Sequence, residues 1–155
     1  REDISSSEYL YNYHKVKQPT AHYFDVDKEL AVQKSVSQLI ASSLVLSSHD
    51  ISDGGLFITL LESAMPNNFG FDITTDAEIR TDAFLFGESQ GRIVVSVAPS
   101  REAAFVDFMQ QQNVPFTTLG HVTKSEVRVD DIAFGFIGDL KNLYDTALEK
   151  IIEGK

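Results

Sequence analysis

The chain has 155 residues, no cysteine and a net charge of −10 at pH 7, from 13 basic and 23 acidic side chains. Its length fits one domain, and the missing cysteines exclude disulfides, zinc–thiolate sites and cysteine nucleophiles. Because nucleic acids and anionic membrane surfaces are bound through clustered Lys and Arg, the acidic balance argues against both as partners. A free nucleotide remains compatible, since Mg²⁺ can bridge carboxylates and phosphates.

Residues 1–25 mix polar and aromatic side chains without a sustained hydrophobic period. We interpret them as a lead-in or as the tail of a preceding domain, and residues 26–155 as the domain proper. The polar start indicates a chain cut from a longer polypeptide. It lacks the apolar stretch of a signal peptide, and no apolar run approaches the roughly 18 residues of a membrane span. We therefore expect a cytoplasmic protein.

The first half of the domain predicts two helices and two strands. Asp27 is expected to cap the first helix, whose apolar stripe runs through Val32, Val36, Leu39 and Ile40. Residues 44–46 are predicted to be a short strand. A second helix, over residues 56–65, is apolar on nearly all sides and is therefore expected to be buried. Residues 69–74 are predicted to be a strand.

The second half contains the best strand of the sequence, the β-branched run over residues 93–97. Ser100 is expected to cap the helix that follows, and residues 113–115 end it. Residues 116–122 and 126–129 are predicted to pair as a hairpin. The clearest helix comes last, because its apolar residues keep to one face: Leu140, Leu143, Tyr144, Ala147, Leu148 and Ile151.

Helices thus alternate with strands, and two strands near the end lie close enough in sequence to pair. This order predicts an α/β (α+β) fold, a layered domain with a mixed β-sheet covered by helices on at least one face.

One polar loop between a predicted strand and helix has the residue types of a binding site. Backbone N–H groups at such a junction can point at an anion, and glycines let the backbone approach a ligand closely. The alternative is structural, with Ser52 or Asp53 as a helix cap and the glycines in a tight turn. The candidate residues are His49, Asp50, Ser52, Asp53, Gly54 and Gly55.

A second polar loop, residues 87–92, precedes the strongest strand. It offers a carboxylate, a hydroxyl and an amide, which are enough to orient a small polar ligand. The alternative is a solvated loop in which Glu88 pairs with Arg92. The candidate residues are Glu88, Ser89, Gln90 and Arg92. From residue types alone, the sequence predicts a globular domain with two polar loops and names no reaction.

Together the two loops resemble the last domain of the formylglycinamidine ribonucleotide synthase family, within the aminoimidazole ribonucleotide synthase C-terminal-domain-like superfamily. The resemblance rests on Ser48-His49-Asp50-Ile51-Ser52-Asp53-Gly54-Gly55-Leu56, on Leu85-Phe86-Gly87-Glu88-Ser89-Gln90-Gly91-Arg92 and on the upstream Ser7-Glu8-Tyr9-Leu10. It covers nearly the whole chain. One departure is Ser5-Ser6, which stands where members of the family often have glycines.

The resemblance implies a domain of a carbon–nitrogen ligase of purine biosynthesis that is inactive when isolated. The full enzyme uses Mg²⁺ and ATP to activate an amide oxygen of formylglycinamide ribonucleotide. Ammonia from a glutaminase domain or subunit then displaces that oxygen. The expected partners are therefore the remaining domains of the enzyme, the glutaminase, a nucleotide and the ribonucleotide substrate.

The loop pattern resembles the C-terminal lobe of the second of the family's two similar halves. In the first half, the copy of Glu-Ser-Gln contacts the substrate, whereas the second half carries an auxiliary nucleotide site in some members. The resemblance therefore implies ligand-facing or interdomain roles for the candidate residues of both loops, with none of them catalytic. Two alternatives remain, a non-catalytic scaffold or nucleotide-holding module and a domain of a related synthase or kinase.

Overall fold

A computed structural model describes residues 4, 6–17, 20–21 and 23–154. The chain divides into two compact units, Arg1–Thr59 with Asp82–Thr118, and Leu60–Thr81 with Leu119–Lys155. Two helices run across the division, α2 (Gly55–Ala64) and α3 (Thr81–Phe86). The boundary expected at residue 25 stays a prediction, although part of the segment before it is held within the first unit by hydrogen bonds described below.

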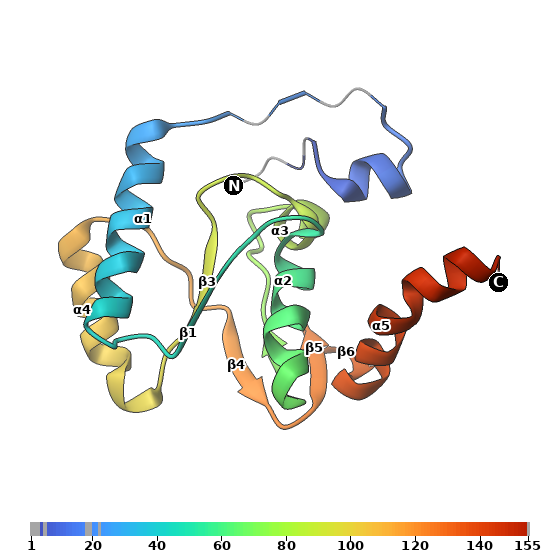
Figure 1. The fold of residues 1–155 in the computed structure, drawn as a ribbon. Coiled ribbons are helices and arrows are strands. Elements are labelled where there is room, and N and C mark those ends of the chain that lie inside the picture. The colour runs from blue at the N-terminus through green and yellow to red at the C-terminus, as the bar shows by residue number, and fades with distance from the viewer. Residues whose placement is uncertain (1–3, 5, 18–19, 22, 155) are drawn as a thin grey trace. The chain divides into compact units, whose positions relative to one another are not determined.

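The first unit packs two helices beside a two-stranded ladder (Figure 1). The helices are α1 (Val26–Ala41) and α4 (Glu102–Gln112), and β1 (Ser47–Asp50) pairs antiparallel with β3 (Ile93–Ser96). Their apolar side chains form one buried cluster, with Leu39 from α1 and Phe105 and Met109 from α4. The predicted stripe of α1 therefore supplies part of this core through Leu39 and Val32, whereas Ile40 of the same stripe is exposed.

Both predicted helix caps were wrong. Asp25, not Asp27, caps α1, because its side chain accepts the Lys28 N–H at 3.2 Å while Asp27 lies in the first turn. Ser100 lies in the 3-10 turn η3 (Pro99–Arg101) that leads into α4, which has no side-chain cap. Pro99 favours this turn, since its fixed φ suits a first helical position.

The first predicted strand is displaced toward the C-terminus. Residues 44–46 do not form it, because Leu44 and Val45 pack against the buried cluster, whereas the ladder with β3 runs from Ser47 to Asp50. The polar residues Ser47, Ser48, His49 and Asp50 thus form a strand that hydrophobic periodicity did not reveal.

The second unit contains a four-stranded mixed sheet in the order β4-β2-β5-β6. Its strands are β2 (Gly70–Ile73), β4 (Gly120–Thr123), β5 (Glu126–Val129) and β6 (Ile132–Phe136). The pair β2–β5 is parallel and the other two pairs are antiparallel. Alternate residues of β2 and β5 are buried on one face of this sheet: Phe71, Ile73, Val127 and Val129. The mixed sheet and the α+β layering confirm the predicted fold class.

The predicted hairpin of residues 116–122 with 126–129 was wrong. Strands β4 and β5 do not pair with each other; each pairs with β2, which lies between them. Their short connection crosses the start of β2 at Gly70, where an added Cβ would lie only 2.0 Å from the Glu126 carbonyl oxygen. The crossing is possible because Gly70 has no side chain.

Strand β6 was not predicted, although the sequence carries its signal. Asp130 and Asp131 both have positive φ, at 50° and 65°, and form the two-residue turn that joins β5 to β6. Two such residues are typical of the turn that fits the twist of a hairpin. The Asp130 carboxylate also accepts the Thr75 N–H at 2.7 Å, which ties this turn to the end of β2.

The last helix, α5 (Ile137–Glu153), forms as its periodicity predicts, and it follows β6 directly. A short 3-10 turn, η2 (Met65–Asn67), ends α2, within one residue of the predicted end at residue 65. Among the described residues, no helix combines the length and apolar character needed to cross a membrane.

Candidate functional site

The first candidate loop begins later than its sequence suggested. His49 and Asp50 are the last two residues of β1 and pair with Val94 and Ile93, so they are strand residues. The turn itself closes where the Gly55 N–H donates to the Ser52 carbonyl at 3.0 Å. Neither Ser52 nor Asp53 caps α2 with its side chain. The tight glycine turn, which was the structural alternative, is present, with φ of 84° at Gly54 and 72° at Gly55.

Gly55 lies against the backbone of α3. A Cβ added at Gly55 would lie 2.7 Å from the Leu85 carbonyl oxygen and 2.7 Å from the Phe86 Cα. The glycine therefore lets the start of α2 approach the end of α3, and so brings the two candidate loops together.

Glu88 is the residue on which the motifs converge. Its Oε1 accepts the Gly54 N–H at 2.9 Å and the Glu8 N–H at 2.9 Å. Three segments that are distant in sequence are thereby joined at one carboxylate oxygen. Hydrogen bonds to a charged acceptor are about twice as strong as neutral ones. Glu88 does not pair with Arg92, which was the alternative left open by the sequence.

Arg92 holds the backbone of the second loop. Its guanidinium donates to the Gly87 carbonyl at 2.8 Å and to the Phe84 carbonyl at 2.9 Å, and it lies 6.0 Å from the centre of the Phe84 ring. The last carbonyls of a helix lack partners within the helix, so these two bonds cap the end of α3.

An aromatic stack joins the upstream motif to the same place. The Tyr9 ring, in the short π-helix η1 (Tyr9–Tyr13), stacks on the Phe86 ring at 4.9 Å, and Phe57 meets Phe86 edge-on at 6.1 Å. Just upstream, Ser6 has a φ of 56°, a conformation that glycine adopts without a steric cost. Ser5 lies outside the described residues.

The candidate residues fall into an internal and an exposed group. Glu88, Arg92, Gly54 and Gly55 hold the two loops together, and Ser89 is buried, with no hydrogen bond to its Oγ among the described residues. His49 is half-buried. Solvent reaches the side chains of Asp50, Ser52, Asp53 and Gln90. The sequence pattern did not reveal that the Glu8 backbone completes the assembly.

The described residues offer no ready-made metal centre. No group of three His, Asp or Glu side chains among them is placed to hold an ion.

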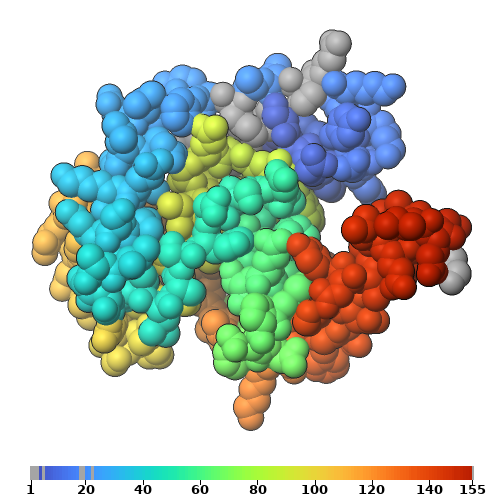
Figure 2. Space-filling view, viewed as in Figure 1, coloured from blue at the N-terminus to red at the C-terminus, as the bar shows by residue number. Residues whose placement is uncertain are grey.

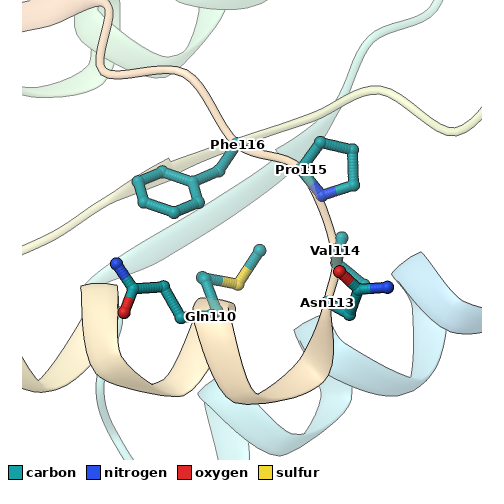
Figure 3. Close-up of a pocket in the computed structure, with 6 residues that line it drawn as sticks. Gln110, Asn113, Val114, Pro115 and Phe116 are labelled. Atoms are coloured by element: carbon teal, nitrogen blue, oxygen red, sulfur yellow. The ribbon is translucent and has the colours of Figure 1, made fainter.

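The hollow drawn in Figure 3 lies away from both loops. It is lined by Met109 and Gln110 of α4 and by residues 113–116, with Phe116 facing the end of that helix. None of these side chains is ionisable, so the hollow offers no acid–base group.

The family model described as AIR synthase related protein, C-terminal domain, matches residues 4–132. The chain belongs to this family. A phosphoribosylformylglycinamidine synthase subunit PurL from Salinibacter ruber is 40% identical over 130 residues, which are 83% of this chain and 17% of that protein. The Alkaliphilus metalliredigens protein of the same name is 30% identical over 155 residues, 97% of this chain and 21% of its own length. This AIR synthase related domain thus spans about a fifth of its curated relatives.

Solved structures share the fold. Thermotoga maritima PurL complexed with FGAR matches with a TM-score of 0.61 and 15% identity, over 72% of this chain and 20% of that one. The same protein complexed with ATP matches with a TM-score of 0.59 and 14% identity, over 70% and 20%. With the family match, these similarities confirm the resemblance to the C-terminal region of formylglycinamidine ribonucleotide synthases within the AIR synthase-like superfamily.

Proposed function

We propose that this AIR synthase related domain is the C-terminal lobe of the second half of a phosphoribosylformylglycinamidine synthase. The observation that carries the proposal is the convergence on Glu88 of the three segments that form the resemblance. Residues that bind a ligand or another domain need a rigid support that holds them in one place. The hydrogen bonds that Glu88 accepts from Glu8 and Gly54 provide such a support.

The whole enzyme would join ammonia to formylglycinamide ribonucleotide. ATP supplies the phosphoryl group that turns the amide oxygen into a leaving group, and the products are the amidine, ADP and phosphate. Mg²⁺ would accompany ATP, a glutaminase domain or subunit would deliver the ammonia, and the reaction would take place in the cytoplasm. Support comes from the names of the relatives and from the PurL structures with FGAR and with ATP.

Within that enzyme, the residues of this lobe would bind and orient rather than react. Glu88 and Arg92 are committed to backbone groups and position the two loops. The exposed Asp50, Ser52, Asp53 and Gln90 would then face a nucleotide, the ribonucleotide or another lobe. Gln90 is the best candidate for direct contact, because its amide can both donate and accept hydrogen bonds.

The internal bonds of Glu88 also favour a second candidate, a lobe that acts only as a scaffold. In that case the exposed loop residues would be dispensable for turnover, whereas the internal ones would matter only for stability.

The test is amidine formation by the full-length enzyme with Gln90→Ala and Asp53→Ala, and with Gln111→Ala as the matched control. Gln111 is an exposed glutamine on α4, away from both loops. If the loops contact a ligand, we expect kcat/KM to fall about tenfold or more for the loop variants, because lost polar contacts cost about 1.5–3 kcal/mol, with unchanged thermal unfolding. The control should keep full activity. Normal kcat/KM in both loop variants would instead support the scaffold.

A further inference from the structure

Two neighbouring residues of the upstream segment contact the second polar loop and the helix end before it. The Glu8 N–H donates to Glu88 Oε1 at 2.9 Å. Next to it, the Tyr9 ring stacks on the Phe86 ring, with the centroids 4.9 Å apart and 13° between the planes. Both contacts lie within the first unit, so they do not depend on what covers the surface of that unit. The upstream segment, which is dark blue and lies at the surface in Figure 2, is thus fastened by a hydrogen bond and a ring contact.

The Tyr9 ring belongs to a series of ring contacts. It also stacks on Tyr13, with the centroids 5.3 Å apart and 10° between the planes, and His14 meets it edge-on at 5.0 Å. On the loop side, Phe57 of α2 meets Phe86 edge-on at 6.1 Å. Aromatic pairs at these separations attract each other beyond the effect of the area they bury. Tyr9 therefore connects the rings of the upstream segment to the rings of α2 and α3.

The second polar loop is held at three points, and Tyr9 contacts the first of them. Phe86 ends α3 immediately before the loop, and Glu88 and Arg92 hold its middle and its end through the bonds described above. Gln90 lies between the last two points and is exposed. A side chain on a loop keeps one direction only where the backbone on both sides of it is fixed. The Tyr9 contact therefore helps to fix the direction of Gln90.

We propose that Tyr9 is a positioning residue for ligand binding by the two polar loops. Its ring fixes Phe86 and keeps the Glu8 N–H against Glu88. Through Glu88 it also acts on Gly54 in the first loop. The inference rests on the proposed function, because the loops affect the reaction only if they contact a ligand. The stack needs a ring and not a hydroxyl, so phenylalanine should replace Tyr9 and alanine should not.

The first experiment measures amidine formation by the full-length enzyme with Tyr9→Ala, Tyr9→Phe and Tyr11→Ala. Tyr11 is the matched control, because it lies in the same short helix and is 55% exposed. Tyr9→Ala should raise the KM for formylglycinamide ribonucleotide or for ATP about three- to tenfold at nearly unchanged kcat, which is the factor for losing one aromatic pair. The other two variants should keep the wild-type values. Lower kcat at unchanged KM would indicate only a loss of folded enzyme and would overturn the proposal.

Hydrogen exchange of the full-length enzyme separates this inference from the proposed function. The amides of residues 52–56 and 84–92, followed by mass spectrometry, should exchange faster in Tyr9→Ala and at the wild-type rate in Tyr9→Phe. Phe86→Leu removes the same stack from the other side and should reproduce the faster exchange and the higher KM, which keeps the test decisive where Tyr9→Ala does not fold. Unchanged exchange in Tyr9→Ala would overturn the positioning role. Faster exchange with unchanged KM values would mean that the loops contact no ligand, so the ligand-facing role would fail and Tyr9 would have no part in the reaction.

Discussion

Helices α1 and α5 both have an apolar stripe, but the two stripes lie in different environments. The α1 stripe places Leu39 in the core of the first unit, where it is 1% exposed, whereas Leu148 of α5 is 68% exposed. The two sequences differ little in period, since both repeat apolar residues at the spacing of helical turns. Periodicity therefore predicts that a helix forms and which face is apolar. It does not identify what that face packs against.

The largest expected effect comes from a glycine. Gly55→Ala forces a side chain into positive φ and into the α3 backbone, which should lower the free energy of unfolding by about 2–6 kcal/mol. Gly138→Ala in α5 is the matched control, because an added Cβ there meets nothing within 4 Å. That variant should unfold no earlier than the wild type, since alanine favours a helix. Urea unfolding of both variants and the wild type is the measurement. If Gly55→Ala is as stable as the wild type, the close contact of α2 with α3 is contradicted.

The next effect tests the two leucines directly. Leu39→Ala should cost about 2–5 kcal/mol of unfolding free energy, because it leaves a cavity in the buried cluster. Leu148→Ala should change it by less than about 0.5 kcal/mol, since the side chain is already in solvent. Thermal unfolding of both variants is the measurement. A large loss with Leu148→Ala would show that α5 is buried within the monomer.

The smallest expected effect on stability concerns the N-terminal ends of α1 and α5. The Lys28 backbone N–H donates to Asp25 and lowers the pKa of that carboxyl below its ordinary value. The charged form is thus favoured in the folded state, so its stabilisation is present at neutral pH and is lost as pH falls through the lowered pKa. The thermal advantage of the wild type over Asp25→Asn should therefore shrink below about pH 4.

Asp139→Asn serves as the control for that titration. Asp139 lies in the first turn of α5, which begins without a side-chain cap. This helix has no side-chain cap to lose, so Asp139→Asn reports the effect of removing one acidic side chain from a first helical turn. Parallel curves for the two variants would rule out a special role of the Asp25 bond.

The sequence predicted the parts of the fold that depend on local pattern. Helices α1, α2, α4 and α5 and strands β2 and β3 form where apolar periodicity places them. Strand β1 was misplaced because its residues are polar and are held by pairing with β3, not by burial. The hairpin of β4 with β5 was wrong because short separation in sequence favours direct pairing, and nothing local shows that β2 lies between them.

The sequence predicted which residues belong to the candidate site, but it did not predict which groups those residues contact. The two loops were found from their polar and glycine content. That Glu88 accepts the backbone N–H of Glu8, eighty residues away, cannot be inferred from residue types. Backbone donors look the same in every sequence, so a carboxylate that binds them resembles one that faces a ligand.

The position of β2 between β4 and β5 has a consequence for how the second unit folds. Every bond that β2 makes joins residues about fifty or more apart, since Phe71 pairs with Val122 and Val127. Only β5 with β6 can form early as a local hairpin. The chain must close a long loop before the central strand gains any partner. The conformational entropy of that loop is therefore lost before the hydrogen bonds and burial of β2 stabilise the sheet. The middle of the sheet is therefore the last part expected to assemble and the step that sets the folding rate of this unit.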